Sequence, residues 1–235
     1  MAEAVAEEAR RCGFVALIGA PNAGKSTLLN ALVGSKISIV TPKVQTTRAL
    51  IRGIAIEGVA QMIFVDTPGI FAPRRRLDRA MVGSAWGSTQ EADLVALLID
   101  SHKGVQDDEE AILKGLADIR APKVLVLNKV DLVEKPKLLA LTQMLNERMA
   151  FAATFMLSAR SGDGVADLKS YFAAHVPPGP WLYPEDQISD APLRQLAAEI
   201  TREKLYLRLH QELPYQSTVE TEVWKELKDG AVRIE

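Results

Sequence analysis

The fold of this chain is decided by the stretch Gly19-Ala20-Pro21-Asn22-Ala23-Gly24-Lys25-Ser26, which fits the pattern G-x-x-x-x-G-K-[ST]. The apolar run 14–18 before it predicts a buried strand, and 27–33 after it predicts a helix that ends at Gly34. Strand, glycine-rich loop and helix in this order predict a loop whose N–H groups and helix dipole face a polyphosphate. We expect these eight residues and Thr27 to bind nucleotide, Lys25 to reach the β- and γ-phosphates, and Ser26 to bind Mg²⁺. The alternative is a chance glycine-rich turn, which the motifs described below disfavour.

The composition is that of a globular protein. The chain has 235 residues, of which 48% are hydrophobic, enough for one large domain or a domain with an appendage. The net charge of −2 provides no global field toward nucleic acid. The single Cys12 excludes an internal disulfide, and residues 1–11 lack the apolar core of a secretory signal. Apolar runs are much shorter than the about 20 residues of a membrane span, so we expect a cytoplasmic protein without a transmembrane segment.

Beyond the first helix, apolar strands alternate with helical segments. We expect strands at 50–56, 59–65, 93–100, 123–127 and 153–157, another beginning at 37–40, and helices at 74–89, 107–119, 136–148 and 163–174. A turn at Glu57-Gly58 joins 50–56 and 59–65 into a hairpin. The pattern predicts an α/β fold with a mostly parallel sheet, one antiparallel edge strand, and helices on both faces. Each motif follows a strand, and it therefore lies at the carboxyl ends of the strands, where such folds bind ligands.

A second motif, Asp66-Thr67-Pro68-Gly69, ends the strand 59–65. We expect Asp66 to hold Mg²⁺ through water and the N–H of Gly69 to approach the γ-phosphate. A turn or helix-capping aspartate is the alternative for Asp66. Ile70 follows within the nucleotide site and cannot orient an attacking water by hydrogen bonding, so we expect slow intrinsic hydrolysis.

The loop 41–48 precedes the hairpin and contains two adjacent threonines. Thr46 or Thr47 is expected to complete the Mg²⁺ coordination once a γ-phosphate is present, and we favour Thr47; an ordinary polar loop threonine is the alternative. The expected catalytic groups are therefore Lys25, Thr47 and Gly69.

Base selection is assigned to Asn128-Lys129-Val130-Asp131, which follows the strand 123–127. A carboxylate at Asp131 accepts from the ring N–H and the amino group of guanine, a donor pair that adenine lacks. Asn128 is expected to join this loop to the phosphate loop, and the stem of Lys129 to lie over the purine. The stretch Ser158-Ala159-Arg160 is expected to place the N–H of Ala159 near the guanine carbonyl.

These motifs together carry a resemblance. GAPNAGKS, QTTR, DTPG, NKVD and SAR, in this order, resemble the TrmE-Era-EngA-EngB-Septin-like GTPases, and within them the Era family of ribosome-assembly GTPases. The stretches 12–14, 36–39, 202–205 and 212–215 are also similar to that family. The resemblance implies a Ras-like P-loop fold, GTP hydrolysis with Mg²⁺, and a role in small ribosomal subunit assembly and ribosomal RNA maturation. It also implies peripheral association with the inner face of the cell membrane.

Two functions remain open beside this one. The first is a nucleotide-dependent binding switch whose hydrolysis is incidental, and the second is a related GTPase of another pathway. The resemblance further concerns Asn22, because relatives use an asparagine there to help bind K⁺ near the phosphates. The alternative is that Asn22 only shapes the loop.

A proline-rich stretch divides the chain. Four prolines within 176–184 predict a semi-rigid linker at 177–184, between a GTPase domain at 1–176 and a segment at 185–235. In that segment we expect strands at 217–224 and from 231, and a helix at 191–209 with core residues Leu193, Leu196, Ile200, Leu205 and Leu209. The resemblance makes it the start of a type II KH RNA-binding domain that stops before its G-x-x-G loop. We therefore expect partial order and weak binding of single-stranded RNA.

Overall fold

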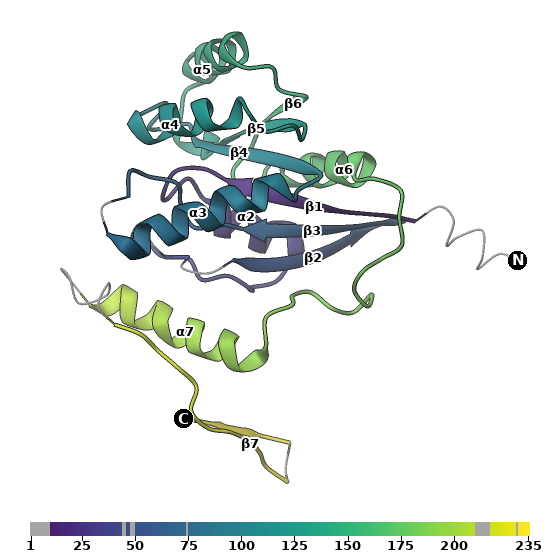
Figure 1. The fold of residues 1–235 in the computed structure, drawn as a ribbon, viewed down its shortest axis with the longest axis vertical. Coiled ribbons are helices and arrows are strands. Elements are labelled where there is room, and N and C mark those ends of the chain that lie inside the picture. The colour runs from purple at the N-terminus through teal and green to yellow at the C-terminus, as the bar shows by residue number, and fades with distance from the viewer. Residues whose placement is uncertain (1–9, 44–45, 48–49, 74, 210–216, 229) are drawn as a thin grey trace, which may run out of the picture.

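One six-stranded sheet organises the molecule, with the strand order β2-β3-β1-β4-β5-β6 (Figure 1). The structure is a computed structural model that describes residues 10–43, 46–47, 50–73, 75–209, 217–228 and 230–235. Gln45 and Arg48 of the QTTR motif, Arg74 at the predicted start of a helix, and the stretch 212–215 lie outside the described residues, as do residues 1–9.

The expected mostly parallel sheet with one antiparallel edge strand is confirmed. Its strands are β1 (Arg11–Ile18), β2 (Ile51–Glu57), β3 (Ala60–Asp66), β4 (Leu94–Asp100), β5 (Lys123–Asn128) and β6 (Ala153–Met156). β2 pairs antiparallel with β3 and forms one edge, whereas the other neighbours run parallel. The carboxyl ends of β1, β3, β4 and β5 therefore lie along one margin of the sheet.

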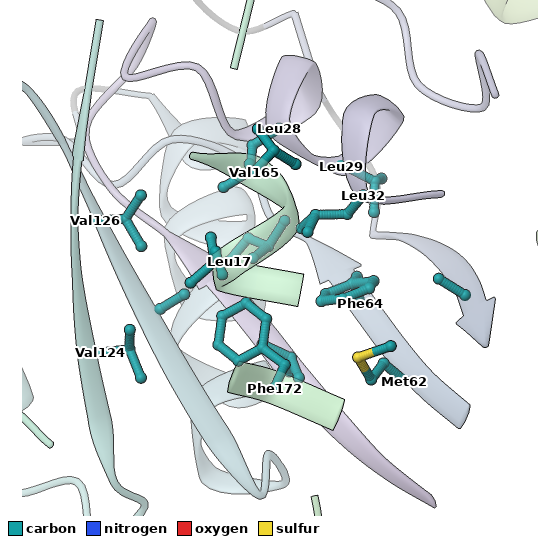
Figure 2. Packing of buried hydrophobic residues seen from close by; sticks show 14 of the residues in the cluster. Leu17, Leu28, Leu29, Leu32, Met62, Phe64, Val124, Val126, Val165 and Phe172 are labelled. Atoms are coloured by element: carbon teal, nitrogen blue, oxygen red, sulfur yellow. The ribbon is translucent and has the colours of Figure 1, made fainter. Parts of the chain in front are cut away.

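Helices cover both faces, as expected. They are α2 (Lys25–Val33), α3 (Arg76–Gln90), α4 (Asp107–Leu116), α5 (Lys135–Arg148) and α6 (Val165–His175). Alternate residues of β1 serve the two cores: Val15 and Leu17 pack with α2 and α6, and Ala16 and Ile18 pack with α3, α4 and α5. Figure 2 shows the first of these cores, where Phe64 of β3 meets Phe172 of α6. Their ring centroids lie 5.8 Å apart, edge to face.

The expected strand at 37–40 is wrong. Ile37 and Ile39 are buried as an alternating pattern predicts, but this stretch pairs with no strand among the residues that the structure describes. The N–H groups of Ile37 and Ser38 instead donate to the side-chain Oδ1 of Asn30 on α2, at 3.0 and 2.9 Å. Asn30 Nδ2 also donates to the carbonyl oxygen of Ser38 at 2.8 Å. One amide side chain thus replaces a neighbouring strand.

The proline-rich stretch lies along the sheet. Cys12 N donates to the carbonyl oxygen of Pro177, and Trp181 Nε1 donates to that of Val59, both at 3.0 Å. Further along, Ile54 N donates to the carbonyl oxygen of Ile188 at 2.9 Å. The chain from 177 to 190 is therefore fixed to β1, β2 and β3 before it reaches the next helix.

That helix, α7 (Leu193–Arg208), lies beyond the β2 edge, and the hairpin of β7 (Trp224–Glu226) and β8 (Val232–Ile234) extends away from it (Figure 1). The expected apolar core of α7 is wrong. Leu193 and Ile200 are exposed, and Leu196, Leu205 and Leu209 are only partly buried. The expected strand at 217–224 is also wrong for all but its last residue, because regular pairing begins at Trp224.

Candidate functional site

The loop between β1 and α2 holds the predicted phosphate-binding residues. α2 begins at Lys25, two residues earlier than expected, so the end of the motif forms its first turn. Gly24 has a φ of 101°, in the left-handed region that residues with side chains rarely adopt. A Cβ atom there would lie 2.2 Å from Asn128 Nδ2, so the position requires glycine. Because the first N–H groups of a helix have no partner within it, this loop suits an anion.

Lys25 folds back over the loop. Its Nζ donates to the carbonyl oxygens of Gly19 and Ala20, at 3.0 Å each. Burial lowers the pKa of Lys25 to about 8, although the charge of Asp66 opposes this effect. A phosphate group in front of the loop would supply the negative charge that a buried ammonium favours.

Asp66 ends β3 and faces the phosphate loop. Its Oδ2 accepts hydrogen bonds from Ser26 Oγ at 2.7 Å, Ser38 Oγ at 2.9 Å and Thr47 Oγ1 at 3.4 Å. Its Oδ1 is buried and has no hydrogen-bond partner within the described part of the chain. Burial raises the pKa of Asp66, against the lowering effect of these hydroxyls and of Lys25. This orphaned carboxylate oxygen and the hydroxyls around it fit a hard cation such as Mg²⁺.

The two candidate threonines differ in their surroundings. Thr47 Oγ1 lies 3.0 Å from Ser26 Oγ, so both hydroxyls converge on Asp66. Thr46 Oγ1 instead lies 2.7 Å from Thr41 Oγ1, within its own loop. The geometry therefore favours Thr47 over Thr46 as a metal ligand.

The turn 67–70 follows Asp66 and packs against β1 and the phosphate loop. Thr67 Oγ1 donates to the carbonyl oxygen of Leu17 at 2.8 Å. A Cβ atom on Gly69 would lie 2.9 Å from Pro21. The side chain of Ile70 is buried in the core beneath the loop and offers no polar group to the site.

The predicted base-binding loops also come together. Lys129 Nζ donates to the carbonyl oxygen of Asn22 at 2.8 Å and to Asp100 Oδ2 at 2.6 Å, which fixes its stem beside the phosphate loop. Asp131 is exposed in the short 3-10 helix η1 (Val130–Leu132), directly after this loop, and is not among the residues that line the cavity described below. Ala159 N donates to Asn128 Oδ1 at 3.0 Å, so the N–H expected to meet a guanine carbonyl is engaged here with Asn128.

A cavity of about 530 Å³ lies in front of these loops. Predicted residues that line it are Pro21, Asn22, Gly24, Lys25, Ser26, Thr27, Thr46, Thr47, Gly69, Lys129 and Arg160. The sequence analysis missed Ile39, Val40, Thr41, Pro42, Lys43, Phe71 and Lys103, which complete the lining. It also missed Ser38 beside Asp66 and Asp100 beside Lys129. The position of Asp100 at the carboxyl end of a buried strand is the signal that could have found it.

Asn22 has a φ of 63°, in the left-handed region that residues with side chains rarely adopt. Its Nδ2 donates to the carbonyl oxygen of Pro42 at 3.0 Å. The side chain thus joins two walls of the cavity.

Of the helices that the structure describes, none has the length and apolar character needed to cross a membrane.

Comparison with known proteins gives a consistent result. Residues 14–129 match a family model described as 50S ribosome-binding GTPase. GTPase Era of Bradyrhizobium diazoefficiens is 67% identical over 230 residues, which cover 98% of this chain and 75% of that protein. GTPase Era of Rhizobium meliloti is 67% identical over 225 residues, which cover 96% of this chain and 72% of that protein.

Two solved structures match at 36% identity. One is Era in complex with MgGDPNP and nucleotides 1506–1542 of 16S ribosomal RNA, with a TM-score of 0.88 over 94% of this chain and 75% of that chain. The other is a point variant of Aquifex aeolicus Era bound to GDP·AlF4⁻, with a TM-score of 0.89 over 95% of this chain and 77% of that chain.

Proposed function

The chain belongs to the Era family of GTPases, and from this membership we propose that it hydrolyses GTP to GDP and phosphate during assembly of the small ribosomal subunit. The observation that carries the chemistry is the convergence of Ser26, Thr47 and Asp66 in front of Lys25. It supports a site in which Lys25 neutralises the β- and γ-phosphates while the two hydroxyls hold Mg²⁺. We assign Asp66 to the same ion through water.

Mg²⁺ would spread the negative charge that develops on the transferred phosphoryl group. The N–H groups of the phosphate loop and of Gly69 orient the same group, and the charge of Lys25 offsets that of the leaving diphosphate. We include Thr47 in the catalytic set because its hydroxyl lies beside Ser26 and Asp66, where the ion would be held.

The base specificity rests on Asp131. Its exposed carboxylate, two residues after Lys129, suits the paired N–H donors of guanine, while the fixed stem of Lys129 covers the purine face. Adenine lacks this donor pair, so a carboxylate buried against it would keep an unpaired charge, which disfavours ATP. Arg160 lines the cavity, and we assign Ser158, Ala159 and Arg160 to the guanine side of the site.

Activation of the attacking water needs a group other than Ile70, whose side chain is buried. We infer that a K⁺ ion near Asn22 assists, because the side chain of Asn22 and the carbonyl oxygen of Pro42 meet at the edge of the cavity. A cation there would add to the charge stabilisation that Mg²⁺ supplies.

The partner is inferred from a relative. One Era structure holds nucleotides 1506–1542 of 16S ribosomal RNA, the RNA of the small subunit, and this chain matches 75% of that protein. The family model named for the 50S subunit spans only 14–129, so its description does not concern the segment after the linker. We propose that 1–176 is the GTPase domain, 177–184 the linker, and 185–235 the first part of an RNA-binding KH domain.

The place of action follows from that partner. Small subunits assemble in the cytoplasm, where we expect the protein to work. Contact with the inner face of the cell membrane stays a prediction.

Phosphate release from GTP tests this proposal, with ATP as the control nucleotide and EDTA as the control for Mg²⁺. We expect slow turnover of GTP alone, no turnover of ATP, and faster turnover when small ribosomal subunits or the 3′ region of their RNA are added. Turnover that these partners leave unchanged would favour the alternative, a binding switch with incidental hydrolysis.

A further inference from the structure

α7 buries charged residues rather than apolar ones. Arg202 and Glu203 are each 3% exposed and Tyr206 is fully buried, whereas Leu193 on the same helix is 66% exposed. Burying a guanidinium and a carboxylate is costly unless each meets a partner of suitable charge or dipole. The face that α7 turns toward the rest of the molecule is therefore built to hold something polar.

What it holds is the loop that carries Thr47. Glu203 Oε2 lies 2.5 Å from Lys36 Nζ, and Glu203 Oε1 accepts from Val40 N at 3.0 Å, at the beginning of the loop. Arg202 Nη2 donates to the carbonyl oxygen of Thr46 at 2.6 Å, at its end. Two consecutive residues of α7 thus hold both ends of the segment 36–47.

The guanidinium of Arg202 is itself held in place. Glu199, one turn earlier, accepts from Nε at 2.9 Å and from Nη2 at 2.5 Å. The ring of Tyr206, one turn later, lies under it at 5.1 Å. These contacts pre-orient the donor that meets Thr46, so little side-chain entropy is lost when the contact forms.

The carbonyl of Thr46 belongs to the peptide bond that leads into Thr47. That bond is planar, so fixing its oxygen fixes the direction in which the backbone enters Thr47. Thr47 Oγ1 in turn lies 3.0 Å from Ser26 Oγ, within the group that fits Mg²⁺. A donor that comes from outside the sheet therefore sets the position of a metal ligand.

We propose that Arg202 is a positioning residue for GTP hydrolysis: it holds the carbonyl of Thr46 so that the Thr47 hydroxyl meets the Mg²⁺ of the GTP-bound site. This inference rests on the proposed function. It makes α7 part of the nucleotide site, because the site loses one ligand when α7 leaves the loop.

Release of fluorescent nucleotides from the whole 235-residue chain tests the inference. In excess Mg²⁺, Arg202→Ala is expected to release a non-hydrolysable GTP analogue roughly tenfold faster, the size of one lost charge-assisted hydrogen bond. GDP release should stay unchanged because Thr47 serves the γ-phosphate state, and EDTA should abolish the difference. Arg202→Lys keeps the charge and one donor, so its release of the GTP analogue should be slower than that of Arg202→Ala and closer to that of the unmodified chain. Arg208→Ala, which removes an exposed arginine of the same helix, is the matched control.

A double-mutant cycle distinguishes a role of Arg202 in positioning Thr47 from a general loss of stability around the nucleotide site. In a Thr47→Ala background, the change at Arg202 should add nothing. The inference is overturned by equal release from the Arg202 and Arg208 variants, by equal acceleration of GTP and GDP analogues, or by full additivity with Thr47→Ala. Should Arg202→Ala fail to fold, Arg202→Lys carries the same cycle. Failure of the unmodified chain to bind the GTP analogue would instead overturn the proposed function.

Discussion

Asn128 Nδ2 donates to the carbonyl oxygen of Ala23 at 2.8 Å, joining two positions 105 residues apart in the sequence. The other end of the same amide, Oδ1, accepts from the N–H groups of Lys129 and Ala159 at 2.8 and 3.0 Å. One buried side chain therefore ties the phosphate loop to both loops assigned to the base. It also leaves no room for a Cβ atom on Gly24.

The first prediction concerns this junction. Asn128→Ala would leave three buried backbone groups without partners, and each such group costs about 1–3 kcal/mol. We expect a fall in the free energy of unfolding of at least about 3 kcal/mol and a loss of guanine-nucleotide affinity. Urea unfolding and a fluorescent-nucleotide titration measure the two effects. Asn146→Ala, on the exposed surface of α5, is the control, and equal behaviour of the two variants would contradict this account.

Base choice is the second prediction. If Asp131 accepts from two donors of guanine, Asp131→Asn should weaken GTP binding and favour xanthine nucleotides, whose added carbonyl suits an amide donor. Competition between GTP and XTP for the same site measures the change. Asp118→Asn, at an exposed position after α4, should leave the preference for GTP intact. Unchanged GTP affinity of the Asp131 variant would remove Asp131 from the site.

The third prediction is that Lys25 serves nucleotide binding at a cost to the stability of the nucleotide-free protein. Its ammonium is buried, so the nucleotide-free protein holds a desolvated charge that only a phosphate fully offsets. Lys25→Met keeps the length and removes the charge. We expect the nucleotide-free variant to be more stable by about 1–3 kcal/mol, because the lowered pKa of Lys25 means that burial disfavours its charged form. Nucleotide affinity should be lost at the same time.

Thermal unfolding without nucleotide compares the Lys25 variant with the unmodified chain. Lys114→Met, at an exposed position of α4, controls for the added methionine and should change neither property. A Lys25 variant that is less stable without nucleotide would show that its two carbonyl contacts outweigh the cost of burial.

The sequence predicts the sheet well because the spacing of apolar residues in its strands and helices reflects which side chains are buried. Val15 and Leu17 face one core and Ala16 and Ile18 the other, so an unbroken apolar run identifies a strand covered on both faces. The sequence also predicts that the motifs lie close together, because each follows a strand and the carboxyl ends of parallel strands lie along the same end of the sheet.

The same reasoning fails where the partner of a segment is polar. The stretch 37–40 alternates like a strand, yet an amide side chain on α2 takes the strand's place. In α7 the apolar stripe predicts the wrong face, because the helix packs against a loop backbone through Arg202 and Glu203. Hydrophobic periodicity contains no information about such contacts, and only the arrangement in space shows them.

The fourth prediction concerns a second cation. If Asn22 helps to hold K⁺ near the phosphates, GTP turnover should be faster in K⁺ than in Na⁺ at equal ionic strength. Asn22→Ala should reduce turnover in K⁺ toward the level in Na⁺ while leaving the affinity for GDP largely intact. Identical turnover of the unmodified chain in the two salts would leave Asn22 with only its contact to Pro42.

The last prediction concerns Gln61, a fully buried polar residue within the apolar strand β3. Its Oε1 accepts from Leu182 N at 2.8 Å and Tyr183 N at 3.0 Å, and its Nε2 donates to the carbonyl oxygen of Tyr183 at 2.8 Å. This one side chain thus satisfies three backbone groups of the proline-rich stretch, where no strand is present to do so. It therefore helps to set where the chain leaves the sheet on its way to α7.

Gln61→Leu fills the same space but leaves those three backbone groups without partners, and they then favour water over the sheet. We expect the stretch around Leu182 to detach, so that chymotrypsin cuts after Trp181 at least several-fold faster while the nucleotide-binding domain remains folded. Gln143→Leu, on the exposed face of α5, is the matched control. Because α7 follows this stretch, the Gln61 variant should also release a GTP analogue faster in Mg²⁺. Unchanged cleavage and unchanged release would show that the other contacts of the stretch hold it in place without Gln61.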